Sequence, residues 1–304
     1  MFNRLFAGRR TFLPFLISLV SFFIIQTVNA QNNTSSVILP GAFIHNFHSK
    51  TNGQDYKLFV SLPDSYSVKD TVHYPVLYLL DGNPFFPLLQ CMQKFYFTGE
   101  ELPEMIIVGI GYHTNTVMES MPNRTLDYTP TNDTAFDNML TKELKMRIKS
   151  GGAFSFLKTL RNDILPFVES QYKTSKDRAI AGHSFGALFG AYVLFHQPEL
   201  FNRYLLSSVS MPWDKDEMLK EELDFFKAGH RVLNAHVYVT VGDKEEFNMK
   251  PLMKQLVKSM REHNYQGLVL EEHILENESH TSAITTAFNH GMRALYKISN
   301  KENK

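Results

Sequence analysis

The stretch Arg178–Phe195 has the sequence RAIAGHSFGALFGAYVLF, with Ser184 between Gly182 and Gly186. A short apolar run precedes the serine and a longer one follows it, which predicts a buried strand that passes directly into a helix. Gly-x-Ser-x-Gly in that context is typical of a nucleophile elbow, a sharp turn that exposes the serine hydroxyl at the helix N-terminus. The alternative is a tight structural turn with an incidental serine.

A serine hydroxyl is a weak nucleophile and needs a base. Seven histidines follow the serine: His196, His230, His236, His263, His273, His280 and His290. Only His280, in ENESHTSA, lies in the turn between the last predicted strand and the last predicted helix, where a loop can carry an imidazole over the sheet. We therefore predict His280 as the base. His183 adjoins the serine, but successive residues on a tight turn point apart.

The acid that orients the imidazole is expected in the loop after HVYVTV. This loop has the sequence Gly242-Asp243-Lys244-Glu245-Glu246, so three carboxylates fall in four positions. Asp243, Glu245 and Glu246 are all candidates, and an ordinary solvated charge run is the alternative. We predict Glu245, because a residue three past the glycine has left the sheet edge and can turn back toward His280.

Two backbone N–H groups should stabilise the developing oxyanion. Phe185 directly follows the nucleophile and is expected to supply one. Asn83, in LLDGNPFF, is expected to supply the other from a tight turn, Asp81-Gly82-Asn83, after an earlier strand. A plain turn is the alternative, because these residue types are common in loops.

Apolar runs alternate with helical periodicities along the rest of the chain. This alternation predicts an α/β fold of the α/β-hydrolase type, a central and mostly parallel sheet flanked by helices in a single domain. The expected strands lie within 42–49, 55–63, 74–82, 104–111, 178–182, 203–210, 236–243 and 268–275. The expected helices lie within 152–172, from 185 onward, and within 216–229, 249–264 and 280–298.

One long excursion, from Tyr112 to Gly152, contains no predicted strand. A polar loop over 121–133 is expected, then a helix over 134–149 that Gly151 and Gly152 close as a C-cap. Long connections at the carboxyl ends of parallel strands usually build the binding site. Arg124 here, with Lys149 and Lys244, is a candidate for binding an anionic substrate, although any surface carries lysines.

The composition is that of an ordinary globular protein, with 31 basic and 31 acidic residues among 304. This balance gives no indication of nucleic acid or of an anionic membrane surface as a partner. Cys91 is the only cysteine, which excludes an internal disulfide and a thiolate-based metal site.

The N-terminus has the pattern of a secretory signal peptide. Arginines precede an apolar run over 12–25, and small residues at Val28 and Ala30 predict cleavage after Ala30. A permanent anchor is the alternative, but the run is short for a span of about 20 residues. The expected organisation is a signal peptide over 1–30, a linker over 31–40, the domain over 41–298 and a polar tail over 299–304. The mature protein is expected to be secreted or periplasmic, without stable membrane insertion.

With these residues placed, the chain resembles the esterase family of α/β-hydrolases. That family includes siderophore esterases, feruloyl and acetyl xylan esterases, S-formylglutathione hydrolases and mycolyltransferases. The resemblance covers roughly 41 to 298 and rests on PVLYLLDGN, IVGIGY, NRTLDYTPT, AIAGHSFGALFG, TVGDKEE and ESHTSA. The Gly-Gly-Ala-Phe and Asp-Tyr-Thr-Pro segments point to its bacterial siderophore-esterase-like branch.

The resemblance implies Ser184 as nucleophile, His280 as base and Glu245 as acid, although some siderophore esterases use a Ser-His dyad. It implies a small-molecule ester as substrate and no metal or organic cofactor. The chain departs from the branch at Ala187, a usual glycine, and in SSVSMPWD, which replaces Ser-Pro-Ser-x-Trp-Trp. Trp213 survives there, and it is expected either to line the acyl or aryl pocket or to pack.

These inferences predict a secreted or periplasmic serine ester hydrolase that works through an acyl-enzyme, with ferric siderophore esters as candidate substrates. A feruloyl or acetyl carbohydrate esterase, or an acyltransferase, would use the same machinery. A non-catalytic binding protein on a hydrolase scaffold is the alternative of another class, and the complete serine, acid and histidine set argues against it.

Overall fold

A computed structural model describes residues 38–69, 71–99, 101–246 and 248–297. Backbone contacts divide the chain into two units, Met1–Pro40 and Gly41–Lys304, and every strand and helix below belongs to the second. The predicted signal peptide over 1–30, most of the linker and the polar tail lie outside the described residues and stay predictions. Within the described ranges, no helix has both the length and the apolar character needed to cross a membrane.

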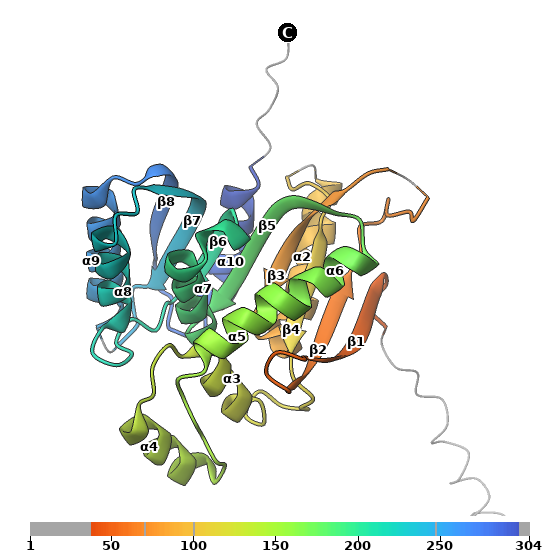
Figure 1. The fold of residues 1–304 in the computed structure, drawn as a ribbon. Helices are drawn as coiled ribbons and strands as arrows, with labels where there is room; N and C mark the ends of the chain where they lie inside the picture. Colours follow the sequence, from red (N-terminus) through yellow and green to blue (C-terminus); the bar gives the residue numbers. More distant parts are fainter. Residues whose placement is uncertain (1–37, 70, 100, 247, 298–304) are drawn as a thin grey trace, which may run out of the picture. The chain divides into compact units, whose positions relative to one another are not determined.

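The described strands form one eight-stranded sheet in the order β1-β2-β4-β3-β5-β6-β7-β8 (Figure 1). β1 pairs with β2 and β2 with β4 in antiparallel fashion, and all the other pairs are parallel. The predicted, mostly parallel sheet is thereby confirmed. The strands are β1 (Ala42–His48), β2 (Asp55–Ser61), β3 (Tyr74–Leu79), β4 (Ile106–Gly111), β5 (Thr174–His183), β6 (Arg203–Ser207), β7 (Val232–Gly242) and β8 (Gln266–Leu275).

Helices cover both faces of this sheet. The run from α5 to α9 lies on one side, and α2 and α10 pack on the other (Figure 1). A π-helical segment, Leu160–Ile164, joins α5 to α6 within the predicted 152–172 helix. The helices are α2 (Gly82–Thr98), α3 (Met121–Tyr128), α4 (Thr134–Leu144), α5 (Ala153–Thr159), α6 (Leu165–Gln171), α7 (Phe185–His196), α8 (Glu217–Lys227), α9 (Met249–His263) and α10 (Ala283–Leu295).

Helix α7 is the central support of the molecule. Every residue from Phe185 to Phe195 is buried, as expected for a helix that is apolar on all sides. Each buried leucine or phenylalanine contributes about 2 kcal/mol of hydrophobic stabilisation. Because α7 begins directly after Ser184, this burial holds the turn that carries the serine in a rigid position.

The excursion after β4 differs from its prediction. Met121–Tyr128 form helix α3, whereas a polar loop was predicted. The helix was missed because its buried residues are Thr125, Asp127 and Tyr128, which give the sequence no apolar periodicity. The next helix, α4, ends at Leu144, and Lys145 adopts a left-handed conformation with φ of 54°. The predicted extension to residue 149 and the C-cap by Gly151 and Gly152 are therefore wrong.

The paired glycines instead bring two segments together. A side chain at Gly152 would meet the carbonyl oxygen of Leu126 at 2.7 Å, so only glycine lets this backbone pack against α3. The N–H of Gly152 donates to that same carbonyl at 2.8 Å. The Gly-Gly pair therefore fixes α3 against the start of α5.

A second difference concerns the segment after β3. Asp81-Gly82-Asn83 was predicted as a tight turn, yet Gly82 is the first residue of the 17-residue helix α2. The prolines in this segment favour a loop when the sequence is considered alone. Pro84 nevertheless lies in the first turn, where helices tolerate proline. Asn83 consequently lies in the first turn of a helix, where backbone N–H groups have no intrahelical acceptor.

Candidate active site

Ser184 lies at the junction of β5 and α7 in a backbone conformation that few residues adopt, with φ of 60° and ψ of −119°. The neighbouring glycines make this turn possible. A Cβ atom at Gly182 would lie 2.4 Å from the carbonyl carbon of Gly186, and one at Gly186 would lie 3.2 Å from a carboxylate oxygen of Asp81. The geometry is that of the predicted elbow, in which backbone strain presents one hydroxyl at the helix N-terminus.

Glu245 and His280 come together across 35 residues of sequence. Nδ1 of His280 lies 2.8 Å from Oε2 of Glu245. The glutamate side chain is fully buried, whereas that of His280 is 44% exposed. A buried carboxylate therefore holds one ring nitrogen while the other edge of the ring remains accessible.

The remaining oxygen of Glu245 is also fixed. Oε1 accepts from the N–H of Gly242 at 2.7 Å and from the hydroxyl of Ser208 at 2.5 Å. Burial raises the pKa of Glu245, but the hydrogen bonds from His280, Ser208 and Gly242 outweigh burial and hold that pKa below its ordinary value. Glu245 is therefore ionised at neutral pH, as an acid that orients an imidazole must be.

The other two carboxylates of this loop take different positions. Glu246 is exposed and lines the cavity described below, and one carboxylate oxygen of Asp243 is buried without a hydrogen-bond partner. Of the three candidates, Glu245 is the one bonded to His280.

A cavity of about 440 Å³ exposes both Ser184 and His280. Within it, the hydroxyl of Ser184 lies 3.2 Å from that of Ser210. The described hydrogen bonds include none between Ser184 and His280, and such contacts often tighten only when substrate binds. The cavity is lined by Ser184, Phe185, Ser210, Lys244, Glu245, Glu246, Met249, Ser279 and His280.

Three serines, at the end of β6 and in the loop after it, contact the candidate site, and sequence reasoning assigned none of them. Ser207 Oγ lies 3.0 Å from Nδ1 of His183, while Ser208 donates to Glu245 and Ser210 meets Ser184. Ser208 has φ of 51°, a left-handed conformation that is rare for a residue with a side chain. A departure from the family pattern in SSVSMPWD was the available signal, but it did not reveal where each hydroxyl points.

His183 packs against the predicted base. The centroids of the His183 and His280 rings lie 4.6 Å apart, with the planes tilted by 45°. Burial, followed by the neighbouring His280 and Arg124, holds the pKa of His183 well below its ordinary value. A neutral His183 therefore supports the His280 ring without adding a competing charge.

The two predicted oxyanion donors both lie at the start of a helix. Phe185 begins α7 and Asn83 is the second residue of α2, so both backbone N–H groups belong to the first turn of a helix. Phe185 lines the cavity, whereas Asn83 is not among its lining residues. The Asn83 side chain bonds to the residue that follows β4, where its Oδ1 accepts from the N–H of Tyr112 at 2.7 Å. The roles of both amides stay predictions.

Arg124 points into the protein. Its side chain is 12% exposed, and Nε donates to Oδ1 of Asp81 at 2.8 Å. Nη2 donates to the carbonyl oxygen of His183 at 3.1 Å. A guanidinium held in this way does not face the cavity, so the structure argues against the predicted contact with an anionic substrate. Lys244 does line the cavity, and Lys149 does not.

Trp213 packs behind the cavity rather than lining it. Its side chain is buried, its Nε1 donates to Thr131 Oγ1 at 3.1 Å, and its ring contacts Phe136 and Phe185 edge-on at 5.1 and 5.2 Å. Of the two expectations for Trp213, packing fits and direct lining of the pocket does not. Its influence on substrate would pass through Phe185.

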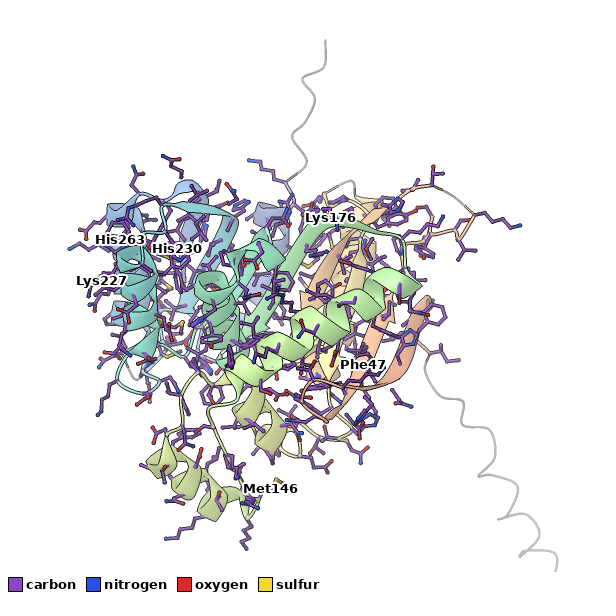
Figure 2. The ribbon with its side chains drawn as sticks, viewed as in Figure 1. Phe47, Met146, Lys176, Lys227, His230 and His263 are labelled. Atoms are coloured by element: carbon purple, nitrogen blue, oxygen red, sulfur yellow. The ribbon has the colours of Figure 1, made fainter. Side chains whose placement is uncertain are left out.

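Histidine–carboxylate pairs recur in this chain, so the pair alone does not identify the site. His263 Nδ1 lies 2.7 Å from the buried Glu222, and His230 stacks on Phe225. His263 is the last residue of α9, and His230 lies just after the end of α8 (Figure 2). His280 differs because its pair lines a cavity together with the elbow serine.

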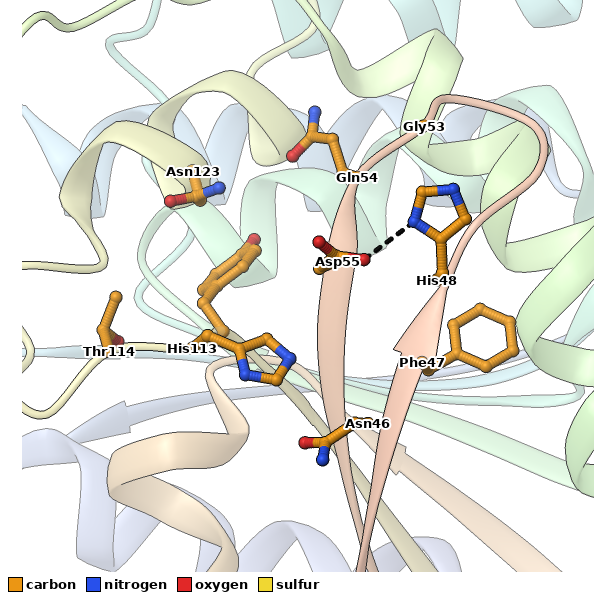
Figure 3. Close-up of a pocket in the computed structure, with 10 residues that line it drawn as sticks. Asn46, Phe47, His48, Gly53, Gln54, Asp55, His113, Thr114 and Asn123 are labelled. Atoms are coloured by element: carbon orange, nitrogen blue, oxygen red, sulfur yellow. Dashed lines mark hydrogen bonds and ion pairs between the residues drawn. The ribbon is translucent and has the colours of Figure 1, made fainter.

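A larger cavity, of about 660 Å³, lies at the edge of the sheet near β1 and β2 (Figure 3). His48 and Asp55 form an exposed pair there, 2.7 Å apart, with His113 across the cavity. The predicted nucleophile Ser184, base His280 and acid Glu245 all line the smaller cavity, and none of them lines the larger one. Among the described residues, no three His, Cys, Asp or Glu side chains are grouped to hold a metal ion.

Asp127→Asn is expected to remove a pH dependence of stability. Burial raises the pKa of Asp127 to about 7, against hydrogen bonds from Tyr56, Tyr112 and Gln54. The folded protein thus binds this proton more tightly than the unfolded chain. The stabilisation from the neutral carboxyl is complete below about pH 4 and is lost as the pH rises to about 7.

The measurement is the free energy of unfolding in urea at about pH 4 and about pH 8, expressed as the difference between variant and wild type. The variant should match wild type at the lower pH and exceed it by a few kcal/mol at the higher pH. Glu143→Gln, at an exposed carboxylate of the same excursion, should change neither value. A difference between Asp127→Asn and wild type that does not vary with pH would contradict the assignment.

Comparison with known proteins finds a family and relatives that match most of this chain. A family model described as "Putative esterase" matches residues 49–282, a range that contains the elbow, the acid loop and His280. Ferri-bacillibactin esterase BesA of Bacillus subtilis (strain 168) is 27% identical over 281 residues, which cover 88% of this chain and 94% of that protein.

Solved structures show the same architecture. The BES protein from Bacillus cereus is 25% identical, with a TM-score of 0.76 over 89% of this chain and all of that one. Siderophore hydrolase EstA from Aspergillus nidulans is 22% identical, with a TM-score of 0.71 over 85% of this chain and 96% of that one. The second likeness shows the fold alone.

Proposed function

Because this chain belongs to the "Putative esterase" family and is a carboxylic ester hydrolase, we propose that it cleaves esters through a covalent intermediate on Ser184. The observation that carries this proposal is the buried Glu245 bonded to His280 at a cavity that also exposes the elbow serine. A positioned base beside a strained, exposed hydroxyl is the arrangement that nucleophilic acyl transfer needs.

The first half of the reaction forms the acyl-enzyme. The Ser184 hydroxyl turns from Ser210 toward His280, Oγ attacks the ester carbonyl carbon, and Nε2 of His280 takes the hydroxyl proton. Glu245 holds Nδ1–H and stabilises the imidazolium that results. The carbonyl oxygen becomes an oxyanion, which accepts from the N–H groups of Phe185 and Asn83. The tetrahedral intermediate collapses, and His280 gives its proton to the leaving alcohol.

Water completes the cycle. His280 takes a proton from a water molecule as the water oxygen attacks the acyl carbon, and the second tetrahedral intermediate expels Ser184, which regains its proton from His280. The products are a carboxylic acid and an alcohol. Apart from the water molecule, the groups used in these steps are side chains and backbone N–H groups of this chain.

For the substrate we propose an ester of a siderophore, the class named for relatives that include the Bacillus subtilis esterase. The cavity, of about 440 Å³, is within the range that accommodates a small organic molecule. Phe185 and Met249 supply apolar contacts for an aryl or acyl group, and Lys244 supplies a cation at its edge. Any iron would arrive with the substrate.

The test combines labelling with a substrate screen. A fluorophosphonate probe should label wild type and not Ser184→Ala. The screen should include nitrophenyl esters, feruloyl sugars, acetyl xylan, and triscatecholate esters with and without iron. A marked preference for the triscatecholates supports the proposal, and a preference for feruloyl or acetylated sugars replaces the substrate. Absence of both labelling and turnover would instead indicate a binding protein.

We further propose that the mature protein is exported and begins near Gln31. The pattern that supports this proposal is the run of arginines, apolar residues and small residues over 1–30. N-terminal sequencing and intact mass of protein recovered outside the cytoplasm should show residues 1–30 removed. Recovery of chains that retain 12–25 would contradict cleavage and favour a membrane anchor.

A further inference from the structure

Arg124 connects two parts of the chain that each precede a predicted oxyanion donor. Its Nε bonds to the carboxylate of Asp81 at 2.8 Å, and its Nη2 bonds to the carbonyl oxygen of His183 at 3.1 Å. Asp81 lies two residues before Asn83, and His183 lies two residues before Phe185. One guanidinium therefore joins the entry to α2 and the entry to α7.

Helix α3 holds Asp81 at a second point. The backbone N–H of Asp81 donates to the Tyr128 hydroxyl at 3.1 Å. Tyr128 is one turn of α3 away from Arg124, so a single short helix fixes both the side chain and the backbone of Asp81. These contacts stabilise a backbone conformation that is uncommon for a residue with a side chain. Asp81 is left-handed, with φ of 54° and ψ of 47°, and this conformation directs the chain into α2.

Arg124 and Asp81 also contact the first residues of α7, next to the elbow. The guanidinium carbon of Arg124 lies 5.3 Å from the centroid of the Phe185 ring, within the range of a cation–π contact. A Cβ atom at Gly186 would lie 3.2 Å from Oδ2 of Asp81, so the first turn of α7 and the Asp81 carboxylate are close neighbours. The two helix starts consequently meet around one buried ion pair.

We infer that Arg124 is a positioning residue that sets the separation and direction of the Asn83 and Phe185 N–H groups. This inference rests on the proposed function, in which those two groups hold the oxyanion. Oxyanion stabilisation depends on donors whose positions are fixed before the reaction. Arg is suited to this task because its planar guanidinium presents several donors in a rigid fork, which lysine lacks.

The buried pair also explains why Arg124 is not expected to recognise substrate charge. Asp81 neutralises the guanidinium within the protein, and two of its nitrogens already donate to protein oxygens. A substrate-binding role and a positioning role therefore make opposite predictions for the kinetics of an Arg124 variant.

Arg124→Ala should lower kcat about 100-fold, the loss typical of removing one oxyanion donor. The loss should be the same for a neutral nitrophenyl ester and an anionic ester, and KM should stay within about threefold for both. An arylboronic acid, which forms a tetrahedral adduct on the serine, should lose affinity by the same factor as kcat/KM. A non-hydrolysable substrate analogue that has no ketone, and so forms no tetrahedral adduct on the serine, should lose little affinity.

Four further variants complete the test. Asp81→Asn should reproduce the effect, and the double variant should be no worse than either single one, because both remove the same connection. Arg124→Lys should recover part of kcat and of boronate affinity. Arg147→Ala, at an exposed arginine of the same excursion, is the matched control and should leave all parameters unchanged.

Several results would overturn the inference. These are a rise in KM confined to the anionic ester, a kcat within threefold of wild type, or strictly additive losses in the double variant. Near-UV circular dichroism checks the fold, and if Arg124→Ala does not fold, unchanged boronate affinity in Arg124→Lys and Asp81→Asn together contradicts the inference. Turnover by Ser184→Ala would contradict the proposed function itself, and the present inference would fail with it.

Discussion

Ser184→Ala should lose about 10⁶-fold in kcat and should take up no fluorophosphonate label. The reason is that the acyl-enzyme can form on no other atom of the site, and deletion of the nucleophile in a comparable serine hydrolase costs about that factor. The residual rate would come from the oxyanion donors and from binding alone. The measurement is hydrolysis of a nitrophenyl ester under saturating conditions, with labelling as an independent readout.

The fold of this variant should be unchanged, because alanine keeps the Cβ atom and the buried helix α7 holds the turn. Ser184→Gly is the matched control. Glycine adopts φ of 60° without strain, so this variant should be equally inactive yet more stable than Ser184→Ala by about 1 kcal/mol. Activity within tenfold of wild type in either variant would show that the elbow is not the site.

Glu245→Gln should lose about 10⁴-fold in kcat, less than the nucleophile variant. Glutamine keeps the volume and can still accept from Ser208 and Gly242 through one oxygen. Its amide would then present a donor to Nδ1 of His280, which forces that nitrogen to accept and puts the ring proton on Nε2. The imidazole would be held in the tautomer that cannot take a proton from Ser184.

The same loop supplies the control for this variant. Asp243→Asn changes a carboxylate that is not bonded to His280 and should stay within a few-fold of wild type. The test compares the steady-state rates of Glu245→Gln, Asp243→Asn and wild type across the pH range. Loss of activity in Asp243→Asn alone would show that Asp243, and not Glu245, is the acid. Near-normal rates in both variants would show that Ser184 and His280 act as a dyad.

The architecture and the positions of the main candidate residues could be predicted from the sequence alone. Buried parallel strands have continuous apolar runs and elbows need glycine at fixed spacing, so both are local patterns that survive without coordinates. His280 could be selected because one loop position in the chain order suits a base. Glu245 could be preferred over Asp243 from the distance that each side chain reaches beyond the strand, and the structure places the Glu245 carboxylate against His280.

The excursion after β4 and helix α2 could not be predicted in this way. Helix α3 buries a threonine, an aspartate and a tyrosine, and its stability comes from contacts with distant segments rather than from apolar periodicity. Helix α2 contains Pro87 and follows a turn-like Asp-Gly-Asn, so local preference favoured a loop that tertiary packing overrides.

The directions of individual side chains depend on tertiary contacts and could not be predicted. Arg124 was expected to face an anionic substrate, but the buried carboxylate of Asp81, 43 residues away in sequence, attracts its guanidinium inward. Ser208 and Ser210 are ordinary loop serines in the sequence, yet their hydroxyls bond to Glu245 and Ser184. The physical reason is common to all three. A hydrogen bond forms only when the donor–acceptor distance is right to within a few tenths of an ångström. The chain brings these groups together only when the whole sheet has formed.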